Sequence, residues 1–127
     1  MGCGRVGAII ARALAERGHT VTILDINEEN LRRLPDSLEI ATLLGDGTLE
    51  EDLKRAGIGE ADVFVAVEER DARNALAAQK VHHMFGIPKV VCHISDPARQ
   101  EMYREIGLEA VSPASTISAM ILDALHM

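Results

Sequence analysis

The stretch Gly2-Cys3-Gly4-Arg5-Val6-Gly7 has the pattern G-x-G-x-x-G and stands directly before a segment of helical period. In a turn between a strand and a helix, the first glycine permits a tight turn and the second lets the backbone approach a pyrophosphate. The third lets the helix pack close to the strand. Because the N–H groups and the dipole at a helix start attract phosphates, the pattern predicts a nucleotide site, although such glycines often only form the turn.

Asp25 strengthens this interpretation, because it ends the next predicted strand 18 residues after Gly7. An acid about 20 residues beyond the glycines is typical of a side chain that accepts hydrogen bonds from both hydroxyls of a ribose. No Arg or Lys stands in Ile26-Asn27-Glu28, and a 2′-phosphate would meet the like charge of Asp25. The sequence therefore favours NAD-type or ADP/ATP-type ligands over NADP.

Arg5 is the cation closest to the predicted phosphates. Because the dipole at a helix start does not stabilise a cation, the presence of Arg5 there favours a role in ligand binding. The alternative is that Arg5 is a solvated side chain of the first helical turn. The chain carries 13 Lys+Arg and 20 Asp+Glu, a formal charge of −7. Since exposed charges are screened beyond ~8 Å at physiological salt, this balance permits an anionic ligand that is held locally.

Short β-branched runs alternate with longer segments of helical period along the chain. This βαβ alternation, with nearly continuous apolar runs in two strands, predicts a doubly wound α/β domain with a parallel Rossmann sheet and right-handed crossovers. The predicted strands are 20–25, 38–43, 62–67, 89–94 and 109–112. The predicted helices are 5–17, 27–34, 48–56, 71–85, 96–106 and 114–126.

The strand that should precede the glycine turn is reduced to Met1. In a sheet of order 3-2-1-4-5-6 this strand is central, so its truncation would leave the hydrogen bonds of its neighbours unmade and open the core. We therefore expect that the natural chain is longer at this end, or that the sequence given omits residues.

Length and composition limit the function classes. At 127 residues the chain predicts a single domain, residues 1–127, with no room for a separate substrate domain. An aromatic content of 2% and the acidic balance offer neither base-stacking side chains nor a phosphate-neutralising face, which excludes nucleic acid as a partner. Adenine would have to pack on aliphatic side chains.

Cys3 and Cys92 form no CxxC pair and are expected to be free thiols of a reducing cytoplasm.

Two further turns follow predicted strands. Gly45-Asp46-Gly47-Thr48 leads into a T-x-x-E capping box formed by Thr48 and Glu51. This turn either serves only to cap the helix or also lies beside the adenosine of a bound nucleotide. Glu68-Glu69-Arg70-Asp71 forms an acidic first helical turn, for which solvation is favoured over a divalent ion.

Side chains for catalysis or for a metal site are not evident in the sequence. His82 and His83 are adjacent on a helix and point about 100° apart, so they do not face one metal. His93 ends a strand and either touches a ligand or is a structural histidine, the latter being favoured. The lone Tyr103 has Gly107 four residues later, where a Tyr-x-x-x-Lys dehydrogenase needs lysine. We therefore predict no enzyme activity.

These motifs together resemble the TrkA N-terminal domain, also called the RCK N-terminal domain, of bacterial and archaeal potassium uptake and channel systems. The resemblance is carried by the glycine turn, Asp25, Gly45-Asp46-Gly47-Thr48, Asn74 and the stretches 90–97 and 107–113, and it covers nearly the whole chain. The family often has Arg at the position of His93 and Thr at that of Glu68, so ligand contacts there are less certain.

The resemblance implies a cofactor site in which the glycines and Arg5 hold phosphates, Asp25 takes the ribose, and Asp46 with Thr48 lies near the adenosine. The full set of implied cofactor-binding residues is Gly2, Cys3, Gly4, Arg5, Val6, Gly7, Asp25, Ile26, Asp46, Gly47, Thr48, Val67, Glu68, Asn74 and His93. The ligand would be NAD(H) or ATP/ADP, with AMP also allowed.

The resemblance also implies a cytoplasmic regulatory domain that controls a potassium channel or transporter subunit from the inner face of the plasma membrane. It would act as a homodimer that can assemble into a ring, and residues 114–126 would be a crossover helix that packs on a partner subunit. The alternatives are a fragment of an NAD-dependent dehydrogenase and a Rossmann-shaped assembly module with an empty site.

Overall fold

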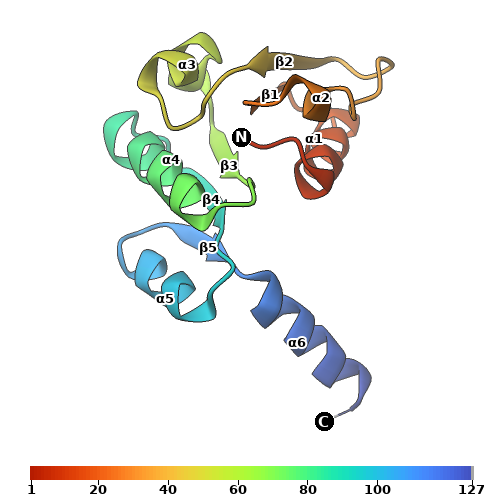
Figure 1. Ribbon diagram of the computed structural model, residues 1–127, viewed down its shortest axis with the longest axis vertical. Helices are drawn as coiled ribbons and strands as arrows, with labels where there is room; N and C mark the ends of the chain where they lie inside the picture. The colour runs from red at the N-terminus through yellow and green to blue at the C-terminus, as the bar shows by residue number, and fades with distance from the viewer. Residues whose placement is uncertain (127) are drawn as a thin grey trace.

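A computed structural model describes residues 1–126 of the chain (Figure 1). Its strands are β1 (Val21–Asp25), β2 (Ile40–Leu44), β3 (Val63–Ala66), β4 (Lys89–His93) and β5 (Glu109–Val111). Its helices are α1 (Arg5–Glu16), α2 (Glu28–Leu31), α3 (Glu50–Arg55), α4 (Asp71–Met84), α5 (Pro97–Glu105) and α6 (Pro113–Ala124), with one 3₁₀ turn at Ile58–Glu60.

All strand pairs are parallel, which confirms the predicted α/β class. β1 pairs with β2 so that Val21 faces Ile40, and β3, β4 and β5 form a second sheet in that order. The two sheets lie one above the other in the view of Figure 1, with α4 and α5 beside the second. The predicted Rossmann arrangement is therefore present in two separate parts.

Met1 and Gly2 join these two parts. The Gly2 N–H donates to the Leu24 carbonyl of β1 at 2.8 Å. On the other side, the Met1 ammonium donates to the Val65 carbonyl at 2.7 Å, and the Val67 N–H donates to the Met1 carbonyl at 2.9 Å. Next to this bridge a cavity of about 740 Å³ opens between β1 and β3.

Side-chain caps fix three of the six α-helix starts in residues 1–126. Asn27, Asp96 and Ser112 each accept a hydrogen bond from a backbone N–H in the first turn, and α5 and α6 have proline at the start. The capping box predicted at Thr48 and Glu51 is wrong, because α3 begins at Glu50 and the Thr48 side chain instead bonds Asp46. The predicted helix 27–34 is one short turn, since the chain from residue 32 turns toward Pro35.

The core is aliphatic, as the scarcity of aromatic residues requires. Its larger cluster lies between the β3–β5 sheet and α4 and is rich in alanine along that helix, including Ala75, Ala77 and Ala78. Small side chains let α4 approach the sheet closely, while Leu53 and Ile94 fill the volume. A smaller cluster of Cys3, Ala11 and Ile23 holds α1 on β1.

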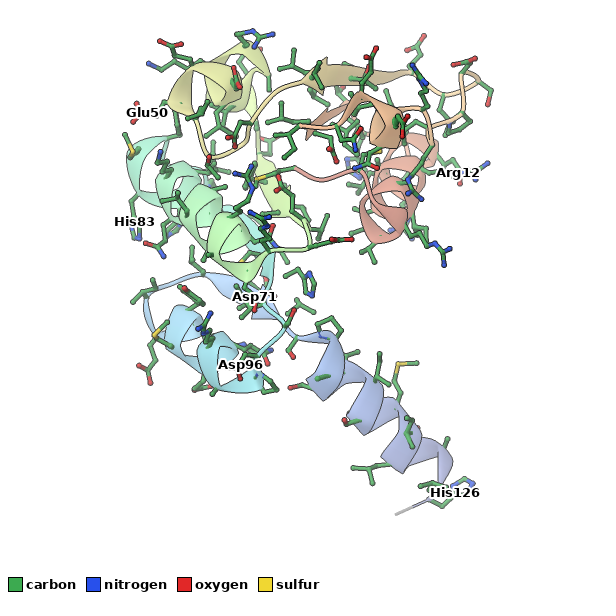
Figure 2. All side chains as sticks on the ribbon, viewed as in Figure 1. Arg12, Glu50, Asp71, His83, Asp96 and His126 are labelled. Atoms are coloured by element: carbon green, nitrogen blue, oxygen red, sulfur yellow. The ribbon has the colours of Figure 1, made fainter. Side chains whose placement is uncertain are left out.

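Helix α6 extends away from the rest of the molecule, and its side chains stand in open space out to His126 (Figure 2). Every residue from Pro113 to His126 is exposed. None of the helices in residues 1–126 is both long and apolar enough to cross a membrane.

The buried bridge at Met1 predicts a pH dependence of stability for the 127-residue chain. Burial lowers the pKa of the Met1 ammonium from 8.0 to about 6. The unfolded chain, with the higher pKa, binds more protons between pH 6 and 8, so stability rises with pH across this window. We expect the free energy of unfolding to be greater at pH 8 than at pH 6 by on the order of 2 kcal/mol, as measured by urea denaturation.

An Nα-acetylated chain has no titratable amine at this position and provides the control. The free energy of unfolding of the acetylated chain should no longer rise between pH 6 and pH 8 on account of this group. An unchanged difference between pH 6 and pH 8 after acetylation would contradict the role of the buried ammonium.

Candidate functional site

The glycine turn leaves the start of α1 open to an anion. Gly4 is the residue before the helix; it provides no side-chain cap, and the first turn of α1 contains no acid. The first N–H groups of a helix have no partner within the helix, and the dipole places partial positive charge there. The start of α1 therefore has free donors and no built-in negative charge, as phosphate binding requires.

The three glycines of the motif serve different purposes. A Cβ on Gly7 would collide with the carbonyl oxygen of Gly2, and a Cβ on Gly2 would lie 2.9 Å from the backbone of Val67 and Glu68. Gly2 also has a φ of +99°, which side chains rarely adopt. By contrast, a Cβ on Gly4 would meet no protein atom within 4 Å. The fold itself explains Gly2 and Gly7, whereas the open space at Gly4 is available to a ligand.

Asp25 is buried and holds the glycine turn in place. One carboxylate oxygen accepts from the Cys3 N–H at 2.7 Å, and the other accepts from the Asn27 N–H at 2.8 Å. The Asn30 side-chain amide reaches both oxygens at a longer 3.3 Å. Asp25 thus ties the end of β1 to the turn that precedes α1, a structural role that its sequence position did not reveal.

Arg73 connects two of the predicted site residues. Its Nη2 donates to Asp46 and its Nε donates to Glu68, each at 2.7 Å. Partial burial opposes ionisation of Asp46, but hydrogen bonds from Arg73 and Thr48 lower the pKa of Asp46 to about 2. The two carboxylates in turn raise the pKa of Arg73. The loop after β2 and the loop after β3 are therefore joined through one guanidinium group.

Asn74 connects the ends of β3 and β4. It is fully buried; its side chain accepts from the Glu68 N–H and donates to the carbonyls of Glu68 and His93. His93 Nδ1 lies 3.3 Å from the Glu68 carbonyl, and its Nε2 is buried without a hydrogen-bond partner in the described part of the chain. The structure thus brings Glu68, Asn74 and His93 together at one edge of the sheet.

The predicted site residues form connected groups, with three exceptions. Cys3 and Asp25 are in contact, Gly2 lies against Val67 and Glu68, and Asp46, Thr48 and Glu68 meet through Arg73. The three that project into solvent are Arg5, Val6 and Ile26. Gly47 lies against the side chain of Met1.

Sequence reasoning missed Asn30, Arg73 and Lys80, whose Nζ donates to the Thr48 carbonyl at 2.6 Å. No spacing rule identifies them, because Arg73 and Lys80 find partners 27 and 32 residues away.

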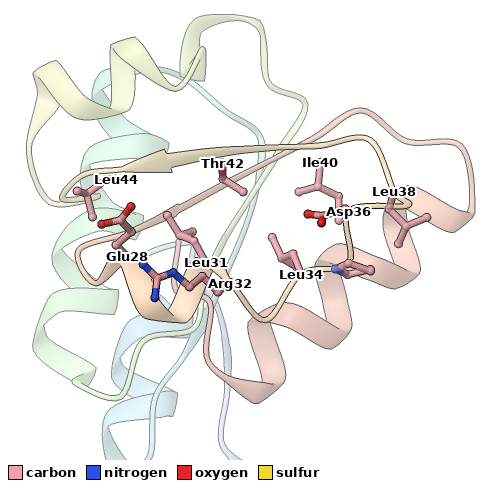
Figure 3. Close-up of a pocket in the computed structure, with 10 residues that line it drawn as sticks. Glu28, Leu31, Arg32, Leu34, Asp36, Leu38, Ile40, Thr42 and Leu44 are labelled. Carbon is pink, nitrogen blue, oxygen red and sulfur yellow. The ribbon is translucent and has the colours of Figure 1, made fainter.

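A hollow of about 650 Å³ between β2 and the segment of residues 28–38 is a separate feature (Figure 3). Leu31 of α2 and the following Arg32 face Ile40 and Thr42 of β2 across it. It contains none of the residues predicted to bind a nucleotide. Within residues 1–126 no group of three His, Cys, Asp or Glu side chains could hold a metal ion.

Two of the three acids in the turn after β3 have partners within the protein. Glu68 pairs with Arg73, and Asp71, at the start of α4 in Figure 2, accepts the Ser95 N–H at 2.8 Å. Cys3 and Cys92 are free thiols, as predicted, and both are buried.

The chain also matches known proteins in sequence. A model of the TrkA-N domain family matches residues 1–113. The Trk system potassium uptake protein TrkA of Streptomyces coelicolor is 41% identical over 125 residues, which is 98% of this chain and 56% of that protein. A TrkA homolog from Methanothermobacter thermautotrophicus is 33% identical over 125 residues, 98% of this chain and 57% of that protein. The chain thus spans little more than half the length of these relatives.

Solved structures share the fold at low sequence identity. The TrkA-N domain of the inner membrane protein ybaL from Escherichia coli has a TM-score of 0.87 at 15% identity and covers 98% of this chain and 92% of that one. The NAD(P)-binding domain of an exopolyphosphatase-related protein from Archaeoglobus fulgidus has a TM-score of 0.78 at 18% identity, covering 98% and 93%. The AMP-bound Kef C-terminal domain of Shewanella denitrificans has a TM-score of 0.74 at 20% identity, covering 98% and 77%.

A parallel α/β arrangement with a glycine turn at the start of α1 makes this a Rossmann-type domain, a class that these solved structures share. The match over residues 1–113 and the identity to the TrkA proteins are more specific. The chain belongs to the TrkA-N domain family, which confirms the resemblance seen in its motifs.

The different surroundings of the glycines predict different effects of adding one methyl group. Gly7→Ala should lower the free energy of unfolding by about 1–3 kcal/mol or more, because the new Cβ collides with the Gly2 backbone. Gly4→Ala, the matched control, should stay within about 0.5–1 kcal/mol of the unaltered chain. Urea denaturation measures both, and equal destabilisation by the two substitutions would contradict this account of the turn.

Proposed function

We propose that this chain is the nucleotide-binding regulatory domain of a potassium uptake system and performs no catalysis of its own. The observation that carries the proposal is the start of α1, where free N–H groups meet open space at Gly4, next to the buried carboxylate of Asp25. Membership of the TrkA-N family and identity to two TrkA proteins support a role in potassium transport.

The phosphates of the nucleotide would lie on the N–H groups at the start of α1, with Arg5 as a mobile cation above them. The exposure of Arg5 fits this role, because an unpaired guanidinium can reach a ligand without first breaking an ion pair. Val6 and Gly7 contribute backbone donors to the same turn.

The ribose would bind at Asp25. A carboxylate has about four acceptor positions, and the two short bonds to backbone N–H groups leave only the long contacts to Asn30 as competition. Ribose hydroxyls would displace Asn30 and keep the turn anchored through Cys3. A 2′-phosphate would bring two negative charges to a buried carboxylate, which favours NAD(H), ATP, ADP or AMP over NADP.

The adenine would pack on exposed aliphatic side chains. Ile26 follows Asp25 directly and is 56% exposed. The loop of Asp46, Gly47 and Thr48 would border the adenosine from the β2 side, in an orientation fixed by Arg73. Because Arg73 also binds Glu68, a ligand that moves the loop of Asp46 would also move the loop of Glu68.

Regulation would follow from a difference in affinity between two arrangements of the assembled protein. A nucleotide shifts such an equilibrium only as far as it binds one arrangement more tightly than the other. We propose a homodimer, which can assemble into a ring, attached to a membrane potassium channel or transporter subunit at the cytoplasmic face of the membrane. Within this proposal residues 1–127 act as one domain.

Calorimetric titration with AMP, ADP, NADH and NADPH tests nucleotide binding. We expect NADPH to bind most weakly. Asp25→Ala should weaken binding of the preferred nucleotide by roughly tenfold to a hundredfold, because charge-assisted hydrogen bonds are worth about 1.5–3 kcal/mol. Gly4→Ala should weaken it at least tenfold while leaving stability unchanged.

Glu28→Ala provides the control, since Glu28 is an exposed acid three residues from Asp25. It should bind nucleotide like the unaltered protein. Equal binding by Gly4→Ala and the unaltered protein would contradict the site, and turnover of NAD with a panel of alcohols would contradict the non-catalytic role.

Helix α6 is the proposed dimer contact. Ile117, Met120, Ile121 and Leu125 recur at helical spacing and are 54–66% exposed, so nothing in residues 1–126 covers the apolar side of α6. A helix from a second copy would bury this stripe.

Ile121→Asp should therefore convert a dimer into a monomer in analytical ultracentrifugation. Ala119→Asp adds the same charge to the opposite side of α6 and should leave the dimer intact. Dissociation by both variants, or by neither, would contradict the proposed contact.

A further inference from the structure

Strand β2 has one edge that no other strand of residues 1–126 pairs with. Its neighbour in the sheet is β1, on the opposite edge. The Gly45 N–H donates to the Asp25 carbonyl of β1, and the backbone groups of alternate residues in a strand point to the same edge. The N–H and C=O groups of Ile40, Thr42 and Leu44 therefore point to the free edge.

The side chains of the same three residues form one wall of the hollow in Figure 3. They share a face of the sheet because alternate side chains of a strand point to the same side. Thr42 is exposed and Leu44 is 51% exposed, so this largely apolar face is open to water. The free edge and the open apolar face thus belong to the same residues.

The sequence of β2 does not protect this edge. Exposed edge strands usually carry charged side chains, proline or a bulge, which prevent pairing with another chain. The stretch Ile40-Ala41-Thr42-Leu43-Leu44 contains neither a charge nor proline, and its register against β1 runs without a break. The edge of β2 is therefore able to pair with a further strand.

The order of residues in β2 suits pairing with itself. If two copies meet antiparallel about Thr42, each Ile40 lies opposite Leu44 of the second copy, and the two Thr42 residues lie opposite each other. Aromatic or β-branched pairs and Thr–Thr pairs are favourable cross-strand neighbours. In this register the two Thr42 residues exchange N–H···O bonds, and each Leu44 N–H reaches the Ile40 carbonyl of the second copy. The Ile40 N–H is not needed, since it already donates to the Leu38 carbonyl at 3.0 Å.

The charged residues around the hollow fit the antiparallel direction. Figure 3 shows Glu28 and Arg32 toward the Leu44 end of β2 and Asp36 beside Ile40, at the other end. Antiparallel pairing brings the Asp36 end of each copy to the Arg32 end of the other. Arg32 is exposed and has no ion pair within residues 1–126, so its charge is available to Asp36 of the second copy.

We propose that the edge of β2 is a self-association site, at which a second copy of this chain adds its own β2 as an antiparallel strand. A twofold axis through Thr42 would relate the copies, so that both make the same contacts and their hollows lie side by side on one face. The contact is separate from α6, which lies at the opposite end of the molecule in Figure 1, and it does not depend on the proposed nucleotide. Pairs of chains joined through α6 would associate further through β2.

Disulfide formation tests the register on the whole 127-residue chain. Opposed residues of a hydrogen-bonded antiparallel pair have Cα atoms about 5.5 Å apart, within the range of about 4.4–6.8 Å that a disulfide spans. Thr42→Cys should therefore form a covalent dimer with copper phenanthroline roughly tenfold faster or more than Ala41→Cys. Ala41 is also exposed, but it points to the opposite face and does not lie opposite itself. Cys3 and Cys92 are fully buried and should not react.

Sedimentation equilibrium of the Ile121→Asp chain isolates the β2 contact from the α6 contact. One strand edge buries little surface, so this association should be weak and should appear only at concentrations above those at which α6 pairs form. Adding Thr42→Lys places like charges at the twofold axis and should abolish the association, whereas Thr42→Val should preserve it. Circular dichroism checks that the variants fold.

Several results would overturn the proposal. They are equal cross-linking of Thr42→Cys and Ala41→Cys, an Ile121→Asp chain that stays monomeric up to about 1 mM, and association that survives Thr42→Lys. Slow hydrogen exchange of the Thr42 and Leu44 amides in the monomer would also overturn it, because another segment of the chain would then cover the edge. These results leave nucleotide binding at Asp25 untouched, so this proposal and the proposed function fail separately.

Discussion

Three main-chain hydrogen bonds of Met1 and Gly2 hold the two sheets of this molecule in register. They connect Leu24 of β1 to Val65 of β3 and Val67 just beyond it, and the two sheets have no strand pairing with each other. Because the glycine turn begins at Gly2, the same bonds fix the start of α1 relative to the ends of β1 and β3. The hydrogen bonds of Met1 and Gly2 that join the two sheets thus also determine the position of the proposed phosphate site.

Polar side chains then fix the turns at the carboxyl ends of the strands. Asp25 anchors the glycine turn, Asn74 joins the ends of β3 and β4, and Arg73 joins Asp46 to Glu68. Each is partly or fully withdrawn from water and satisfied by more than one partner, which makes the arrangement specific. A ligand can therefore replace one partner without disturbing the site. If ribose replaced Asn30, the bonds of Asp25 to the Cys3 and Asn27 N–H groups would keep the geometry.

Much of the fold could be predicted from local pattern. The β-branched runs at 20–25, 62–67 and 89–94 identified strands, because a parallel strand buried on both faces needs continuous apolar residues. The capping box at Thr48 was wrong, since α3 begins only at Glu50 and Thr48 instead donates its N–H and its hydroxyl to Asp46. Family membership was confirmed, but the contact between Arg73 and Asp46 could not be predicted, because the two residues are 27 positions apart and become neighbours only when α4 meets the loop after β2. The predicted ligand contacts and the crossover helix stay predictions.

The central claim is that a nucleotide binds at the start of α1, with its ribose at Asp25. A crystal structure of the protein with ADP tests it most directly. The account predicts phosphate oxygens within hydrogen-bond distance of the backbone N–H groups of residues 4–7, and ribose hydroxyls on the carboxylate of Asp25 in place of the Asn30 amide. ADP bound elsewhere, or with its phosphates away from the glycine turn, would contradict it.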